Sequence, residues 1–439
     1  MDLPSAPSKV SRARDLNRAA RLSVVSAFAR APGFLVPVLI AATFGAGRET
    51  DAYFIAYAAA LLVGGTISQG VEVAIVPFAA REISMRGRGA IAFVDRGALE
   101  TGGIALLLWG AAIVASFFLV RPDLRQAATT FGLSFAPLVL AWCASSAYSG
   151  TLIARDAIGV ATGTSILRGV GGVIALVIAP RGLGLSAVAL GLGAGEVVRV
   201  WWMRRALLRR LIDAGTGGPR SVGFARAAFA QVTAVAIGGT APLGERVLAT
   251  SLGTGGVSHL EYAARLLIVP QLVFDGALSP ILLSRWSREI AVRGRGPKPQ
   301  EVAKEVLEGM GVALAMGAVL ALTAPFWVHL ILRHGHFSDV DAAEVSDLLR
   351  LLSLGFVFSM GAVLLERYFM ATARNRTLAL LSVLRVLTRV GVAFALIAHL
   401  RLRAFACGFA GGELVYLLAL AATLWKRPSD LSVSGPSRE

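Results

Sequence analysis

The sequence is 439 residues long and combines 56% hydrophobic with only 16% charged residues, at a mean hydropathy of +0.69. Soluble domains carry about 25% charged residues, so this composition excludes an ordinary soluble protein and predicts an all-α polytopic membrane protein. The net charge of +16 does not indicate nucleic-acid binding, which needs basic residues clustered with aromatic ones on a soluble face, and the sequence shows no such cluster.

Twelve apolar segments are long enough to cross the hydrocarbon core of a bilayer, which takes about 20 residues of helix. We expect helices because lipid offers backbone groups no other hydrogen-bond partner. The predicted helices run over residues 22–44, 51–80, 97–120, 127–154, 158–180, 183–208, 224–250, 257–285, 304–333, 346–372, 376–400 and 403–425.

Two glycine-rich hairpins, residues 44–54 and 252–265, share one pattern: an apolar residue, Gly-x-Gly, a hydroxyl residue and an aromatic. Glycine supplies the backbone freedom that a tight turn needs. We therefore expect both hairpins to act as hinges between helices, with an acid beginning the second helix. The predicted hinge and gate residues are Gly45, Gly47, Asp51, Gly253 and Gly255.

The loops predict an orientation. Loops on one side, with both chain termini, carry most of the basic residues, whereas the loops on the hairpin side carry few. By the positive-inside rule, both termini are cytoplasmic and the hairpins face outward. The basic tail before the first helix lacks a small-residue cleavage site, so we expect it to be retained.

The longest basic connection divides the chain into two halves of six helices. We expect a cytoplasmic basic tail (1–21), an N-terminal six-helix lobe (22–209), a cytoplasmic linker (210–223), a C-terminal six-helix lobe (224–426) and a cytoplasmic tail (427–439). Short motifs recur between the halves in the same order and at near-constant offsets, as Gly195-Glu196 and Gly412-Glu413 do. Because six is even, the repeat is parallel, and its pseudo-two-fold axis runs along the membrane normal.

Charged residues inside the apolar segments should face protein or a water-filled cavity, because lipid disfavours them. Arg168 with Glu196, and the twin pair Arg385 with Glu413, fit structural ion pairs that are duplicated with the repeat. Glu72 and Glu245 are the candidates for ion coupling.

Three further arginines, Arg30, Arg246 and Arg265, lie on predicted helices that would surround a central cleft. Arginine suits bidentate recognition of phosphate, so these are the candidate substrate-binding residues. In the alternative interpretation, Glu245 neutralises Arg246 locally and Arg265 lies at the outer membrane interface.

The sequence shows no motif for disulfide bonds, metal binding, catalysis or nucleotide binding. Cys143 and Cys407 both lie in apolar segments and fit core positions, without a disulfide framework. The histidines show no metal-binding spacing, and no catalytic constellation or nucleotide-binding loop is visible. We therefore expect a protein that is not an enzyme and that uses no metal and no cofactor.

An ordered set of short motifs resembles the MurJ/MviN lipid II flippases of the multidrug/oligosaccharidyl-lipid/polysaccharide (MOP) exporter superfamily. The motifs are Ala29-Arg30-x-x-Gly33-Phe34, Phe44-Gly45-Ala46-Gly47, Thr50-Asp51-Ala52-Tyr53-Phe54 and the stretch from Glu245 to Leu266. The resemblance implies two lobes around a cationic cavity that alternates between inward- and outward-facing states. Carried over by position, Arg30 and Arg265 match cavity arginines, and Asp51 matches an acid at the outer end of the second helix.

The sequence departs from the family pattern at three places. A second arginine on the first helix, followed by an acid, falls on Val36-Pro37 here, an arginine on the second helix falls near Gly64-Gly65, and an acid before the Arg265 position is Ala264. Polysaccharide-unit flippases of the same superfamily have twelve helices, so both substrate classes stay open.

Three functions are consistent with these observations. The first is a flippase, expected to be monomeric, for a polyprenyl-pyrophosphate-linked saccharide, either lipid II or a polysaccharide repeat unit. The second is a MATE-like drug or cation antiporter, and the third is a non-transporting flippase homologue that acts as a scaffold or regulator.

Overall fold

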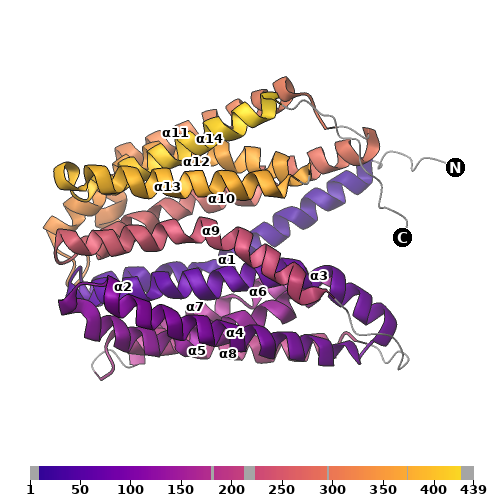
Figure 1. Cartoon of the computed structure of the whole chain (residues 1–439), viewed down its shortest axis with the longest axis horizontal. Coiled ribbons are helices and arrows are strands. Elements are labelled where there is room, and N and C mark those ends of the chain that lie inside the picture. The colour runs from indigo at the N-terminus through magenta and orange to yellow at the C-terminus, as the bar shows by residue number, and fades with distance from the viewer. Residues whose placement is uncertain (1–8, 179–181, 212–222, 294–295, 373, 427–439) are drawn as a thin grey trace.

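The computed structural model describes residues 9–178, 182–211, 223–293, 296–372 and 374–426. Within these ranges the chain forms twelve helical rods that run up and down through one bundle (Figure 1). The first half consists of α1 (Lys9–Phe44), α2, η1 and α3 (Arg48–Ala60, Leu61–Gly65, Thr66–Arg86), α4 (Ala90–Leu119), η2 and α5 (Pro122–Leu124, Arg125–Ala154), α6 and α7 (Ile158–Gly163, Ile166–Ile178) and α8 (Leu185–Leu208). The second half consists of α9 and η3 (Phe224–Ala249, Thr250–Leu252), α10 (Gly256–Arg293), α11 (Pro299–Ile331), α12 (Asp339–Ala371), α13 (Asn375–Leu400) and α14 (Arg403–Lys426).

The composition of the rods fits a membrane-spanning bundle. Over the described residues, ten helical stretches are long and apolar enough to cross a bilayer, and the apolar part of α1 runs over Phe28–Phe44. Large apolar side chains such as Leu107, Phe118 and Leu322 are exposed on the outer helices, as expected where lipid is the solvent. The first helix is longer than predicted, because α1 begins at Lys9 and the apolar segment predicted a start at residue 22.

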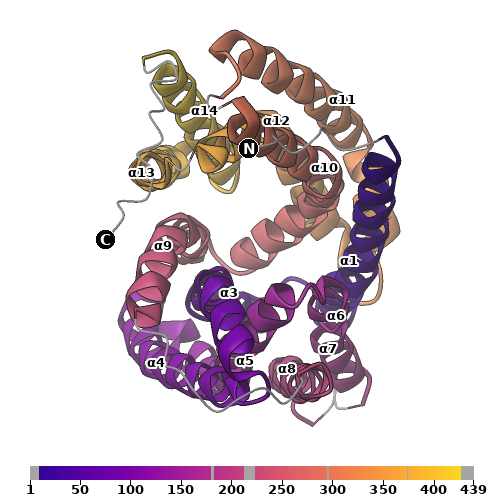
Figure 2. The same ribbon diagram turned by 90° about the vertical axis from the view of Figure 1, so that its right-hand side faces the viewer.

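The helices gather into two groups, the first half on one side of the molecule and α10–α14 on the other (Figures 1 and 2). The first rod of each half contacts both groups: α1 packs against α7 and α10, and α9 packs against α3 and α13. Close packing of α9 on α3 depends on Gly70, where an added β-carbon would lie 2.6 Å from the backbone nitrogen of Val232. Viewed along the bundle, α1 and α9 lie on opposite sides of the space between the groups (Figure 2).

The second rod is not the single α-helix that its apolar run predicts. Its middle is a π-helical turn over Leu61–Gly65, flanked by α2 and α3. The two glycines of this turn face Trp142 of α5, and an added β-carbon at Gly64 or Gly65 would lie 3.4 Å from the Trp142 ring. Such π turns are rare and often lie at functional sites.

The two ends of the bundle differ. We call the end with the loops at 45–47, 253–255 and 332–338 the hairpin end, and the end where α1 begins and α14 ends the tail end. Hydrogen bonds join the two halves at the hairpin end, between residues 42–51 or 121 of the first half and residues 250–262 or 336 of the second. Toward the tail end the two groups of helices diverge (Figure 1).

Repeat-related residues of α2 and α10 touch each other. Thr50 and Ser258 are 208 residues apart, the offset of the two hairpins, and their hydroxyl oxygens lie 2.9 Å apart. One turn further, Phe54 and Tyr262 make an edge-to-face ring contact with centroids 5.3 Å apart. The guanidinium of Arg265 then lies over the ring of Tyr57, 5.2 Å from its centroid. Contact between equivalent positions is expected where two helices cross on a pseudo-two-fold axis.

Candidate functional site

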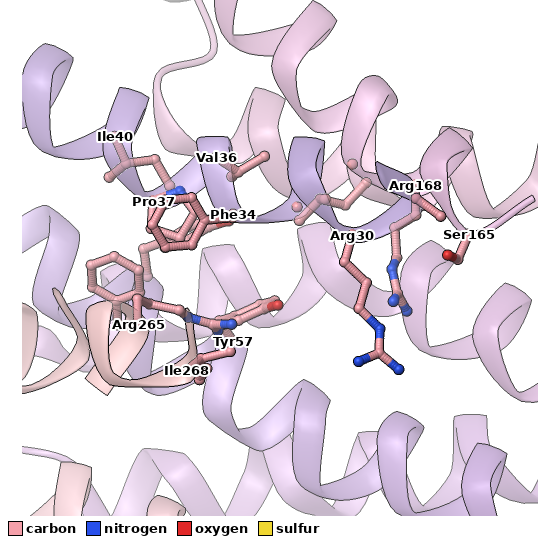
Figure 3. A pocket seen from close by; sticks show the side chains of 16 residues that line it. Arg30, Phe34, Val36, Pro37, Ile40, Tyr57, Ser165, Arg168, Arg265 and Ile268 are labelled. Carbon is pink, nitrogen blue, oxygen red and sulfur yellow. The ribbon is translucent and has the colours of Figure 1, made fainter. Parts of the chain in front are cut away.

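A cavity of about 200 Å³ lies between the two halves, next to the crossing of α2 and α10 (Figure 3). Its wall brings together three arginines, Arg30 of α1, Arg168 of α7 and Arg265 of α10. Apart from Ser165, the rest of the wall is apolar or aromatic and includes Phe34, Pro37, Ile40, Tyr53, Tyr57, Leu192 and Ile268. No carboxylate is among the residues that line it. Of the three predicted substrate-binding arginines, the structure therefore places Arg30 and Arg265 in one cavity.

Arg30 is exposed to the cavity and, within the described part of the chain, makes no hydrogen bond and no ion pair. It lies two residues before Pro32, in a helix that also contains Pro37. Proline in a helix removes a backbone hydrogen bond and promotes a kink. Figure 3 shows the Arg30 side chain extending away from α1 into open space. The N–H donors of this guanidinium are therefore available to a ligand.

Arg265 is partly neutralised by a residue that the sequence analysis overlooked. Glu261, one helical turn earlier on α10 and buried, accepts a hydrogen bond from Nε of Arg265 at 2.7 Å. The other Glu261 oxygen accepts a hydrogen bond from Nε of Arg246 at 2.9 Å. One carboxylate therefore serves two guanidiniums, and the group retains one positive charge. The i,i+4 spacing of Glu261 and Arg265 is the sequence signal that could have revealed it.

The expectation that Glu245 neutralises Arg246 is wrong. Arg246 is buried against Glu261, donates to the carbonyl oxygen of Pro242 at 2.8 Å, and is not among the residues that line the cavity. Glu245 instead binds Arg389 of α13 through both oxygens, at 2.5 and 2.7 Å. Consecutive residues of a helix point about 100° apart, so Glu245 and Arg246 reach different neighbouring helices.

The twin pairs of charged residues differ between the halves. In the second half, Arg385 binds Glu413 directly, with donor–acceptor distances of 2.9 and 2.5 Å. In the first half, Glu196 accepts hydrogen bonds from Arg199 at 2.8 Å and from Ser145 at 2.6 Å. Nε of Arg168 stays 3.8 Å from Glu196, too far for a hydrogen bond. The predicted ion pair of Arg168 with Glu196 is therefore present without a hydrogen bond, and Arg168 also lines the cavity, which its sequence did not indicate.

The two predicted coupling acids both lie beside arginines. Glu72 of α3 is half-buried, with Arg199 and Ser149 nearby, and is not part of the cavity wall. Glu245 is held by Arg389, as described above. A carboxylate paired in this way must exchange its arginine partner before it can bind a cation.

Asp51 joins the two halves at the hairpin end. Its carboxylate accepts hydrogen bonds from the backbone N–H groups of Gly255 and Ser258, at 2.6 and 2.8 Å, and from the Ser258 hydroxyl at 2.7 Å. The first N–H groups of a helix have no partner within the helix. An acid at the start of α2 thus caps the start of α10, across the boundary between the halves.

The predicted hinge glycines divide into two kinds. Gly45, Gly253 and Gly255 have φ values of +69°, +106° and +87°, which side chains rarely adopt. Gly47 is extended, with φ −154°, and an added β-carbon there would meet nothing within 4 Å. Three of the four hinge glycines are therefore required on conformational grounds, and Gly47 is not.

Comparison with known proteins identifies the family. The model of the family described as lipid II flippase MurJ matches residues 40–432. A solved structure of lipid II flippase MurJ in an inward closed conformation is 16% identical, with a TM-score of 0.77 over 92% of this chain and 87% of that chain.

Transporters outside that family share the fold. An inward-facing multidrug resistance MATE family transporter of the MOP superfamily is 15% identical, with a TM-score of 0.70 over 92% of this chain and 99% of that chain. A MOP superfamily transporter from Pyrococcus furiosus is 16% identical, with a TM-score of 0.67 over 93% of this chain and 95% of that chain. These likenesses show the MOP fold of two six-helix lobes that the sequence predicts, and the family match over nearly the whole chain separates it from the MATE transporters. The chain belongs to the MurJ lipid II flippase family, whose members are multi-pass transporters of the bacterial inner membrane and not enzymes.

Proposed function

We propose that this protein carries a polyprenyl-pyrophosphate-linked saccharide, a lipid II-type precursor or a polysaccharide repeat unit, across the inner membrane by alternating access. The observation that supports this proposal is the cavity between the halves, lined by three arginines from three helices and by no carboxylate. Cations in a cavity that no carboxylate lines favour an anionic ligand, and guanidinium groups match the geometry of phosphate oxygens.

The cavity wall also suits the remainder of such a ligand. Aromatic side chains, Phe34, Tyr53, Phe54 and Tyr57, lie beside the arginines. Aromatic rings commonly present an apolar face to a ligand while their edges or hydroxyls stay polar. We assign Arg30 and Arg265 to contact with the pyrophosphate, and Arg246 to holding Glu261, and through it Arg265, in place.

The hairpin end serves as the gate in this proposal. The bonds from Asp51 to Gly255 and Ser258 hold the halves together there, while the helices diverge toward the tail end (Figure 1). Transport requires these bonds to break so that the cavity opens toward the hairpin end. Gly45, Gly253 and Gly255 supply the turns about which the helix pairs move. With the orientation indicated by the basic loops, the gate faces outward and both termini are cytoplasmic. Because one chain builds the whole cavity, we expect a monomer to suffice.

The direct test is translocation of fluorescent lipid II in proteoliposomes that contain the full chain. We expect Arg30→Ala to lower the flipping rate about tenfold or more, since a hydrogen bond to a charged group contributes about 1.5–3 kcal/mol. The matched control is Arg204→Ala, which removes an arginine at the tail end that is paired with Asp95 outside the cavity.

Three outcomes would contradict the proposal in different ways. Unchanged flipping in Arg30→Ala and Arg265→Ala would refute the assigned site. Absence of flipping by the wild-type chain, together with failure to replace a depleted lipid II flippase in cells, would favour the non-transporting homologue. Ion-coupled dye efflux that Glu72→Gln abolishes would favour an antiporter.

A further inference from the structure

The three arginines of the cavity are not equivalent. Arg265 shares Glu261 with Arg246, so part of its charge is already compensated. Arg30 makes no hydrogen bond or ion pair within the described residues. Arg168 forms a long ion pair with Glu196, at 3.8 Å, and among the described residues its buried Nη1 has no hydrogen-bond partner. Figure 3 shows Arg30 and Arg168 extending side by side from α1 and α7, with Arg265 and Tyr57 at the opposite end of the cavity.

The repeat explains why Arg168 is available. In the second half Arg385, its counterpart, is fully engaged by Glu413. Three residues after Glu413 stands Tyr416, whereas three residues after Glu196 stands Arg199. Arg199 binds the Glu196 carboxylate from within α8, at 2.8 Å, whereas Arg168 stays 3.8 Å from the same carboxylate and makes no hydrogen bond to it.

The guanidinium of Arg168 packs on an aromatic side chain. Arg168 stacks on the ring of Trp142, 4.2 Å from its centroid. The same ring also neighbours Gly64 and Gly65 of the π-helical turn, where the absence of side chains lets the indole lie against the backbone. Stacking on an aromatic face leaves the edge of a guanidinium, with its N–H donors, free to bind oxygen atoms.

We propose that Arg30 and Arg168 form a diphosphate subsite of this cavity, and that Arg199 keeps Arg168 available by binding Glu196. The proposal rests on the proposed function and names the residues that recognise the charged part of the substrate. Arg30 and Arg168 line one cavity, and Glu196 compensates only one of the two charges, so the pair stays positive. A ligand with two phosphate groups can contact both guanidiniums at once, which one with a single phosphate does less well. The subsite therefore selects diphosphate over monophosphate.

The test measures equilibrium binding and not transport. Purified full-length protein in detergent is titrated with farnesyl diphosphate and with farnesyl monophosphate, which share the isoprenoid chain and lack the saccharide. We expect Arg168→Gln to weaken diphosphate binding about 10- to 100-fold, the equivalent of losing one charged hydrogen bond, and to change monophosphate binding less.

Two further variants separate a binding role from a structural one. Arg385→Gln removes the twin arginine outside the cavity, and we expect it to keep the preference for diphosphate. Arg199→Tyr copies the second half, and we expect Glu196 to bind Arg168 and the preference to fall although Arg168 is still present. This second variant also answers the question if Arg168→Gln does not fold.

The proposal is overturned if Arg168→Gln and Arg199→Tyr both keep the wild-type preference for diphosphate, or if Arg385→Gln loses it to the same degree. These results are distinct from failure of the proposed function. Normal diphosphate selectivity in a chain that does not flip lipid II would contradict only the transport proposal. Loss of flipping in Arg30→Ala with normal selectivity in Arg168→Gln would contradict only the subsite.

Discussion

Replacing Asp51 with asparagine tests the gate directly. In the closed hairpin end, one oxygen of Asp51 accepts from the Ser258 N–H and hydroxyl, and the other accepts from the Gly255 N–H. Asparagine has the same shape but no charge, and its NH₂ group would face an N–H donor in place of one of the oxygens. At least one bond is lost, and the remaining ones are no longer charge-assisted.

The size of the effect follows from these bonds. A hydrogen bond to a charged group contributes about 1.5–3 kcal/mol, and water replaces it when the gate opens. We therefore expect Asp51→Asn to shift the equilibrium between closed and open hairpin ends by about 1.5–3 kcal/mol, which is about 10- to 100-fold. The shift favours the open state because Asp51 makes these three bonds only when α2 and α10 are together.

The populations can be measured by electron–electron double resonance between spin labels at Glu49→Cys and Ser251→Cys, which are exposed on the two halves at this end. The background replaces Cys143 and Cys407, the two native cysteines. The control variant, Asp339→Asn, removes an acid at the same end whose partner, Arg333, belongs to the same half. An unchanged distance distribution in Asp51→Asn, or an equal change in Asp339→Asn, would refute the reasoning.

Two further predictions concern the buried charges and the orientation. Glu261→Gln leaves Arg246 and Arg265 without their shared carboxylate, and loss of one partner of a buried ion pair costs about 3–5 kcal/mol. We expect a clearly lower thermal unfolding temperature, partly restored by adding Arg246→Met, and wild-type stability in Glu261→Gln would contradict this. In spheroplasts, a membrane-impermeant maleimide should label Ser251→Cys at the hairpin end but not Ser84→Cys near the tail end, and the reverse pattern would invert the proposed orientation.

The architecture could be predicted from the sequence because it depends on local and periodic signals. The apolar runs give the twelve rods, and the glycines at 45, 253 and 255 mark turns whose positive φ values require them. The matching motifs of the two hairpins predicted the internal repeat. The contact of Thr50 with Ser258, which are equivalent positions of that repeat, agrees with a pseudo-two-fold axis between α2 and α10. The π-helical turn at Leu61–Gly65 has no comparable signal, since the same apolar run fits an uninterrupted helix.

The pairing of charges was less predictable, because each arginine has several acids within reach in sequence and the choice is made by packing. Glu245 adjoins Arg246 in the chain but faces α13 in the fold, where Arg389 binds it. Whether Arg168 binds Glu196 depends on a third residue, Arg199, that competes for the same carboxylate. Competition of this kind appears only when three side chains are placed together in space.

The crossing of α2 and α10 shows what joining two copies of one fold permits. In a symmetric dimer of identical halves, every residue on the two-fold axis faces its own copy. A position occupied by arginine would then bring two guanidiniums together, and each aromatic ring would meet an identical ring. In the single chain, Arg265 meets Tyr57 and Tyr262 meets Phe54. Fusion of the halves thus allows a cation to lie near the pseudo-two-fold axis without a second cation opposite it. The residues that line the transport path can therefore differ between the two lobes, although the helices keep their pseudo-two-fold arrangement.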